Sequence, residues 1–438
     1  MKKIIFSPIN SLFTAAALLA CSAPVFAELP TFPLNDEFTT SSNETVSSTG
    51  ENWTQNVINS TGVWNIVGDM AQVNWNYEGW HRNFLTGDGT INLGSDTQGG
   101  SLYIMGSNPV AEEVYNKWFD FAGTINVARN GQFTLGGSYN SHYGTIFSIG
   151  TLNINGGTVY VMSETANNSY FSIKNLTVRD GGMLDSALSL TTASGGTWNL
   201  HSAEGVVSSL LRVQSGTFTL NLLGENALSR LPRLSFDNDL ATDFRINVSA
   251  DNSIETLELN SNATLGLSVA DGATLKIENL TSKSNAQSLT EVTFVFYDYS
   301  ADSVLFGFSD MNVEDNRLYI PSIDTFVNLV AYDGEGNLLQ GEWFYDWNGE
   351  TGRLVLNAVP EPAAVAARGR SGSAARSGNA DIFVRNFYRP RKKREWERRV
   401  FGGGYAGLPL KRRRKCTQRV KNPANVGLGK VDKSCAKT

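Results

Sequence analysis

The sequence is poor in cysteine and histidine, and each shortage excludes a class of protein. Its cysteines are Cys21, Cys416 and Cys435, so the long segment between the first two contains none. That segment has no disulfide staples, which small secreted domains commonly need. The histidines, His81, His142 and His201, are far apart in the sequence, whereas zinc sites are built largely from Cys and His. We therefore expect a body without disulfides, metal or cofactor.

Long apolar runs are also scarce, and the N-terminal one is too short to span a bilayer. Two lysines precede this apolar segment, residues 12–20, and a small-residue cleavage motif ends at Ala27. The sequence therefore predicts a signal peptide and a mature chain that begins at Glu28. The alternative is a lipoprotein-type cut before Cys21, because the Leu-Leu-Ala that precedes it is similar to a lipobox. No other stretch predicts a transmembrane helix.

Positive charge is scarce in most of the chain and abundant at its end. Residues 1–362 hold 15 Lys and Arg against 38 Asp and Glu, and residues 363–438 hold 21 against 4. The net charges of these two parts are −23 and +17. Such asymmetry indicates a functional tail or a segment of different origin. Because an exported protein seldom meets nucleic acid, we expect no nucleic-acid partner for the tail and predict that it is disordered.

Short runs of alternating apolar and polar residues dominate the acidic part. Each run has an apolar side chain at every second position, which is the period of a β-strand with one apolar face. Six of these runs open at Gly123, Gly131, Gly150, Gly157, Gly196 and Gly216. We attribute these glycines to the positive φ that a tight corner requires. Runs that open at Thr256, Thr264 and Thr274 are only 8 and 10 residues apart, which leaves no room for helical crossovers.

These patterns predict an all-β protein, and two architectures fit them: a right-handed parallel β-helix, or β-solenoid, and a meander of hairpins. We favour the solenoid because strong hairpin pairs such as Asn-Gly do not recur at every turn. The open end of a solenoid needs a cap, which an aromatic and Asn-rich segment can supply. The predicted organisation is a signal peptide (1–27), an N-terminal β cap (28–120), solenoid repeats (121–290), a C-terminal β section (291–357), a short motif (358–367) and a basic disordered tail (368–438).

The short motif lies directly after the last predicted strand. Its residues Val359, Pro360, Glu361 and Pro362 resemble the opening of a PEP-CTERM sorting signal, a C-terminal tag of exported proteins in Gram-negative bacteria. The resemblance implies an exosortase-type sorting machinery as a partner, and a link with exopolysaccharide or biofilm. It also implies a location in the cell envelope, at the outer surface or in the extracellular matrix.

The chain departs from that family after Ala367. The family has an apolar membrane-spanning segment there, followed by a small Arg cluster, whereas this chain continues with Arg368 into the basic tail. An Arg at the bilayer centre costs about 2.5–3.5 kcal/mol, so no stable transmembrane span is expected in this copy. A frameshift near residue 367 would explain the departure.

The body has a second resemblance, to the β-helical passenger regions of autotransporter-like adhesins. It lies in the strands of Gly-Thr-apolar-polar-apolar form over residues 120–280. Together the two resemblances imply a non-enzymatic, structural or adhesive protein that is associated with envelope or extracellular polysaccharide.

Two alternative functions remain at this point. The first is a glycan-binding module that uses aromatic side chains near the N-terminus, which fit the core of a cap equally well: Trp53, Trp64, Trp75, Tyr77 and Trp80. The second is a polysaccharide lyase or hydrolase, for which the densest group of carboxylates is Asp237, Asp239 and Asp243 beside Arg245. Sequence motifs typical of β-helical pectin-degrading enzymes are not found, so we predict no catalytic residues and no enzyme.

Overall fold

The computed structural model describes residues 29–49, 56–78, 85–108, 116–139, 145–162, 170–236, 242–282, 289–298 and 300–358. These residues form β-strands and two short 3-10 segments, η1 (Ser300–Ser303) and η2 (Pro321–Ile323). The chain divides into two compact units, and every described residue belongs to the first, 1–371. In the described part of the chain, no helix has the length and apolarity needed to cross a membrane.

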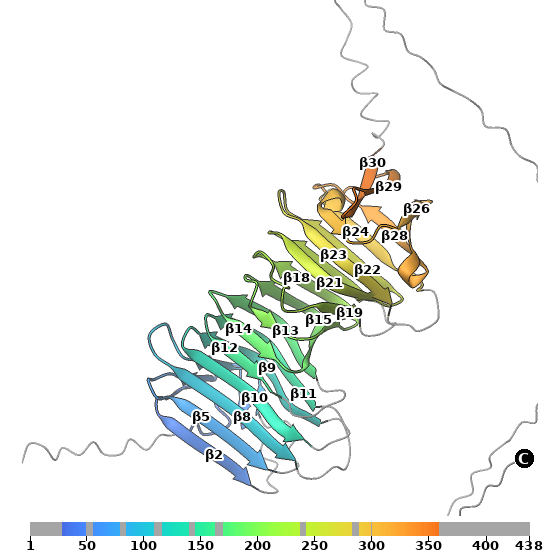
Figure 1. Ribbon diagram of the computed structural model, residues 1–438. Coiled ribbons are helices and arrows are strands. Elements are labelled where there is room, and N and C mark those ends of the chain that lie inside the picture. Colours follow the sequence, from blue (N-terminus) through green and yellow to red (C-terminus); the bar gives the residue numbers. More distant parts are fainter. Residues whose placement is uncertain are drawn as a thin grey trace, which may run out of the picture. The chain divides into compact units, whose positions relative to one another are not determined.

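One parallel ladder, called here the first ladder, organises the structure (Figure 1). Its strands are β1 (Glu37–Thr40), β4 (Val63–Ile66), β7 (Thr90–Leu93), β9 (Asn116–Ala128), β11 (Thr145–Asn155), β13 (Tyr170–Arg179), β15 (Ser189–Leu200), β18 (Gly216–Leu222), β20 (Thr242–Val248), β22 (Ala263–Val269) and β24 (Thr293–Tyr297). Each pairs in parallel with the next. Consecutive coils therefore stack, and the predicted β-solenoid is confirmed over the hairpin meander.

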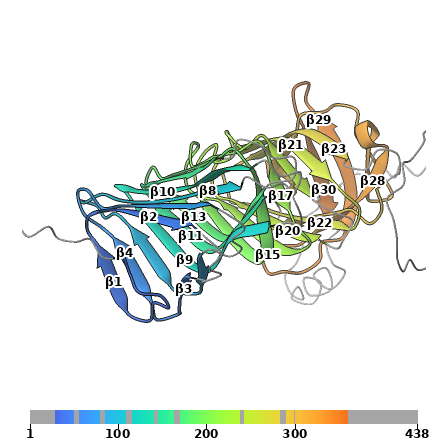
Figure 2. The ribbon, with the colours of Figure 1, turned by 90° about the horizontal axis from the view of Figure 1, so that it is seen from below.

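A second ladder runs beside the first (Figure 2). It contains β2 (Asn43–Thr49), β5 (Gln72–Glu78), β8 (Gly100–Asn108), β10 (Gly131–Tyr139), β12 (Thr158–Val161), β14 (Met183–Ser186) and β16 (Val206–Val207). A further side of the coils is formed by β3 (Asn56–Ile58), β6 (Leu85–Gly87), β17 (Leu211–Val213), β19 (Arg233–Phe236), β21 (Asn252–Leu259) and β23 (Leu275–Ser282), together with the first halves of β9, β11, β13 and β15.

The alternating pattern places one column of apolar side chains inside the coils. On the first ladder this inward column is fully or almost fully buried along its length: Trp64, Ile91, Ile125, Leu152, Leu176, Trp198, Leu220, Ile246, Leu267 and Phe296. It joins the inward columns of the other sides in a single hydrophobic core. At about 1.5–3 kcal/mol for each large apolar side chain, burial in this core is the main stabilising term.

The glycines that open strands have a different role from the one predicted. Of the six, only Gly216 has a positive φ, +99°. A Cβ at Gly150 would lie 1.9 Å from the carbonyl oxygen of Ala122, and four of the others would meet a backbone oxygen of the preceding coil at 2.2 Å. At these five positions glycine is needed because consecutive coils approach too closely for a side chain, and not because of the corner conformation.

The predicted boundary at residue 120 does not coincide with a change in pairing. Parallel pairing already begins at β1 and β2, so most described residues of 28–120 belong to coils of the same kind as those that follow. In the first coil, Phe38 and Thr40 of β1 are paired in register with Trp64 and Ile66. Phe32 and Leu34, which precede β1, also pack against the core, and the Phe32 ring meets Trp64 edge-on at 6.0 Å. Apolar side chains therefore cover the core at this end as well.

The C-terminal section adds antiparallel pairs to the parallel ladders. It contains β25 (Val304–Phe306), β26 (Asn312–Glu314), β27 (Arg317–Ile320), β28 (Thr325–Ala331), β29 (Gly341–Trp347) and β30 (Gly352–Ala358). Strands β25 and β28 still pair in parallel with β23 and β24, whereas β26, β27, β29 and β30 are joined by antiparallel pairing. The hairpin β29–β30 pairs with β25, and its Trp343 packs on Phe296 of the last first-ladder strand, with ring centroids 5.5 Å apart. This section covers apolar side chains of the last coil with aromatic side chains.

Candidate functional site

The structure removes Trp64 from the predicted glycan-contacting residues. Its side chain is fully buried in the inward column, and its indole Nε1 donates to the Thr40 hydroxyl at 3.1 Å. Alternation along β4 decides this, because Trp64 and Ile66 point inward while Asn65 lies between them on the outer face. The core interpretation is therefore correct for this residue.

Other predicted sites fall where the structure does not describe them. Trp53, Trp80, the cleavage residues Ala27 and Glu28, and the sorting motif Val359, Pro360, Glu361 and Pro362 lie outside the described residues, as do Asp237 and Asp239. Trp75 and Tyr77 belong to β5, where the register pairs Trp75 with Ile104 and Tyr77 with Gly106, and their side chains are likewise outside the description.

The outer face of the first ladder has a feature that the sequence interpretation missed, a column of hydrogen-bonded asparagines. We call it the Asn ladder: Asn65, Asn92, Asn126 and Asn153, then, beyond Thr177, Asn199, Asn221 and Asn247. The side-chain amides of Asn92, Asn126, Asn153, Asn221 and Asn247 each donate to the oxygen of the preceding asparagine at 2.7–2.9 Å, over 22 to 34 residues of chain. The first member, Asn65, donates to the Glu37 carboxylate at 2.7 Å. At the interruption, Asn199 donates to the Thr177 hydroxyl at 3.4 Å.

A second polar column runs beside the Asn ladder, two residues earlier on each strand. We call it the Thr column: Thr90, Thr124, Thr151, Asn175, Thr197 and Thr219, in register from β7 to β18. Every member is partly exposed, and the apolar residue between the two columns points inward. The recurring triplet Thr-apolar-Asn was visible in the sequence, but only the register shows that its copies form continuous rows.

The Asn ladder changes character at its C-terminal end. In register, Asn247 is followed by Ser268 and then by Tyr297. The ring of Tyr297 stacks on Tyr332 at 5.7 Å and 14°, and the Arg245 guanidinium lies 4.3 Å from its centroid. Arg245, one of the predicted enzymatic residues, thus makes a cation–π contact here.

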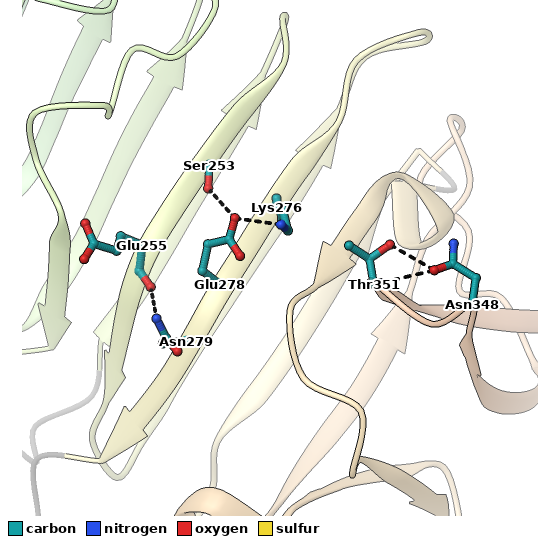
Figure 3. Close-up of polar contacts among 7 residues, drawn as sticks. All are labelled: Ser253, Glu255, Lys276, Glu278, Asn279, Asn348 and Thr351. Carbon is teal, nitrogen blue, oxygen red and sulfur yellow. Dashed lines mark hydrogen bonds and ion pairs between the residues drawn. The ribbon is translucent and has the colours of Figure 1, made fainter.

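Several described acidic side chains form ion pairs or hold turns. Figure 3 shows Lys276 and Glu278 on β23 as an ion pair of 2.8 Å, with both side chains about one-third exposed, and Ser253 of β21 donates to the same carboxylate at 3.5 Å. The more buried Glu258 contacts Arg233 and Ser235, each at 2.5 Å. Each of these carboxylates has a cationic and a hydroxyl neighbour.

In two acidic turns, a side chain accepts hydrogen bonds from backbone N–H groups of the same turn. The Asp333 carboxylate accepts bonds from the backbone N–H of Glu335 and Asn337 and from the Asn337 side chain, and these bonds lower the pKa of Asp333. In the β29–β30 turn, the Asn348 side-chain oxygen accepts from Thr351 (Figure 3). Within the described residues, no three His, Cys, Asp or Glu side chains gather as they would around a metal ion.

No protein-family model matches the chain, and no curated protein sequence matches it.

Proposed function

We propose that this protein is a non-enzymatic, exported β-solenoid of the cell surface or extracellular matrix, with a structural or adhesive role. The observation that carries the proposal is the stacking of parallel coils around one continuous apolar core. Such a fold is held together by contacts between neighbouring coils and presents extended surfaces, which suits spacing, scaffolding and adhesion. A body without cysteine also holds its fold without disulfides.

Export and envelope location are proposed from the N-terminal segment and from the motif at Val359–Pro362. We propose envelope or extracellular polysaccharide as the partner, and exosortase-type sorting machinery where the motif is read. The basic tail adds a salt-dependent attraction to acidic surfaces, including the acidic body of the same chain.

The test is fractionation of the producing cells, with mass spectrometry of the purified chain. We expect a mature N-terminus at Glu28, or at Cys21 if a lipoprotein signal is used. We also expect release from the envelope by high salt without detergent. An intact Met1 in the cytoplasm would contradict export. A requirement for detergent at high salt would show membrane anchoring, and a Cys21→Ala variant then separates lipidation from a working C-terminal tag.

A further inference from the structure

We propose that the outer face of the first ladder is a binding surface for an extended, uncharged polysaccharide, which lies along the Asn ladder and the Thr column. The inference rests on the proposed function, and it names the surface and the class of ligand. Three properties of the surface carry it: its remaining hydrogen-bonding capacity, its lack of charge and its regular spacing.

The hydrogen-bonding capacity follows from counting the groups on each amide. An asparagine amide has two N–H donors and an oxygen with two lone pairs. At Asn126, one N–H is used toward Asn92 and one lone pair is used by Asn153. Each interior rung of the ladder therefore keeps a donor and an acceptor side by side, held in position by its neighbours. Vicinal hydroxyls of a sugar match such a pair, since each hydroxyl both donates and accepts.

The two columns are uncharged over most of their length, although the part of the chain that contains them is strongly acidic. The part of the chain up to residue 362 has a net charge of −23, yet from Thr90 to Asn221 the two columns contain only Thr and Asn. The next charged position in register is Arg245, at the C-terminal end. Two charged side chains border the columns: Glu37 accepts a bond from Asn65, and Arg179, two residues after Thr177 on β13, pairs with Asp180. An anionic polymer would find no cations along these rows, and a cationic one would find no carboxylates. The surface therefore matches a neutral ligand.

The surface also lacks the anchors of a protein interface. Protein partners are held mainly by buried aromatic, Arg and large apolar side chains. The exposed large hydrophobic residues in the described part of the chain all lie outside the two columns: Met70, Met162, Leu223, Phe326, Leu338 and Phe344. A hydrated polyhydroxyl ligand needs no such anchor.

Regular spacing indicates a polymer rather than a single sugar. Neighbouring rungs of a β-sheet are about 4.8 Å apart, and the two columns, two residues apart on a strand, are separated by about 7 Å. The same donor–acceptor pair is thus repeated along the coils at a pitch close to that of the residues in an extended glycan. Individual contacts are weak, but their simultaneous formation along one chain raises the affinity.

The test compares two lysine substitutions in neighbouring strands of the same coil. Thr151 of β11 belongs to the Thr column, whereas Thr158 of β12 lies on the outer face of the second ladder, and both are partly exposed. The full-length wild-type, Thr151→Lys and Thr158→Lys chains are incubated with cellulose, insoluble β-1,3-glucan and β-mannan. Salt of about 0.5 M screens the basic tail. Circular dichroism and urea unfolding verify the fold of each variant.

We expect the wild type and Thr158→Lys to bind at least one of these neutral glycans, and Thr151→Lys to bind it at least tenfold more weakly. Polygalacturonate, an anionic glycan, is incubated with the same chains as a control. The inference is overturned if the wild type binds none of the neutral glycans, if it binds only polygalacturonate, or if both variants lose affinity equally. These results would leave the proposed function intact as long as the chain is exported and associated with the envelope. The proposed function is tested separately, and a chain found in the cytoplasm with Met1 intact would contradict it.

Discussion

The parallel coils and the C-terminal section, with its antiparallel hairpins, bury their apolar side chains in different ways. In the coils, each inward residue packs between its counterparts in the coils before and after, as Leu152 does between Ile125 and Leu176. In the C-terminal section, a hairpin folds over the last coil and supplies Trp343 and Tyr345, which contact Phe296 and Phe306. The coils repeat the same packing from one coil to the next, whereas the C-terminal section covers the apolar side chains of the last coil.

This difference predicts how far the loss of one buried residue destabilises the rest of the structure. A residue in the coils supports two neighbours, so its loss weakens the stack on both sides. A residue in the C-terminal section supports only the last coil. The two ends are covered by different elements: Phe32 and Phe38, from the segment before β1 and from β1 itself, pack on the first described coil, while the β29–β30 hairpin packs Trp343 on the last.

The largest effect is expected from a cavity in the coils. Trp198 is fully buried, meets the Phe218 ring edge-on and donates from its indole to the Ile173 carbonyl at 3.1 Å. Trp198→Ala should lower the free energy of unfolding by about 3–5 kcal/mol, measured by urea unfolding. Hydrogen exchange should show lost protection in coils on both sides. Trp343→Ala is the matched change in the C-terminal section, and its loss of protection should stay near β29 and β30. If protection were lost over equally many strands in both variants, the two regions would not differ in how they share stability.

The next effect concerns the outer face of the coils. Asn126→Ala removes the bonds to Asn92 and Asn153, at 2.8 and 2.9 Å. With about 1 kcal/mol for each bond, the free energy of unfolding should fall by about 1–2 kcal/mol. Thr124→Ala, on the same strand but in the Thr column, should cost less because it breaks no bond of the Asn ladder. A larger cost for Thr124→Ala in urea unfolding would contradict a stabilising role of the ladder.

A smaller effect, with a pH signature, is expected in the C-terminal section. The Tyr345 hydroxyl donates to the Phe308 carbonyl at 2.6 Å, and burial, together with the nearby Asp310, raises the pKa of Tyr345 above its usual 10.0. The stabilisation from the neutral phenol is therefore fully present below pH 10 and is lost as the pH rises beyond it. Tyr345→Phe should cost about 1 kcal/mol near neutral pH.

Urea unfolding at several pH values checks this prediction. The stability difference between wild type and Tyr345→Phe should shrink above pH 10, because only the wild type loses stability by ionisation of this group. A difference that is constant with pH would show that the phenol is not held neutral by the fold.

The smallest effect is expected at an exposed turn of the C-terminal section. Hydrogen bonds from Asn337 lower the pKa of Asp333 below its usual value, so they stabilise the turn above that value and are lost as the pH falls through the lowered pKa. Asn337→Ala should raise the pKa of Asp333, which an NMR titration of the carboxyl carbon measures. Asn348→Ala, in the β29–β30 turn, should leave it unchanged.

Much of the fold could be predicted because its signal is local. A run such as Thr151 to Ile154 already shows which residues point inward, and these positions are buried as expected. The short distances between runs also excluded helical crossovers. The role of Gly150 could not be predicted, because it depends on the carbonyl of Ala122, which belongs to another coil.

The candidate surface shows the same division. The Thr-apolar-Asn triplets are printed in the sequence, but Asn92 and Asn126 are 34 residues apart, and the sequence does not state that they are neighbours. The aromatic residues near the N-terminus could not be assigned from the sequence, because their residue type alone does not distinguish a glycan site from a core. Aromatic residues suit both a glycan site and a core, and for Trp64 the position within β4 decided for the core.

By itself, the sequence determined the strands, their inward faces and the absence of disulfides from the body, because alternation and composition act within a few residues. Only the tertiary structure decided which coils are neighbours and in what register, and therefore that Asn65, Asn92 and Asn126 form one hydrogen-bonded row. The physical reason is that coil length varies, with ladder partners 22 to 34 residues apart, so register is set by packing and backbone pairing between coils and not by a fixed repeat.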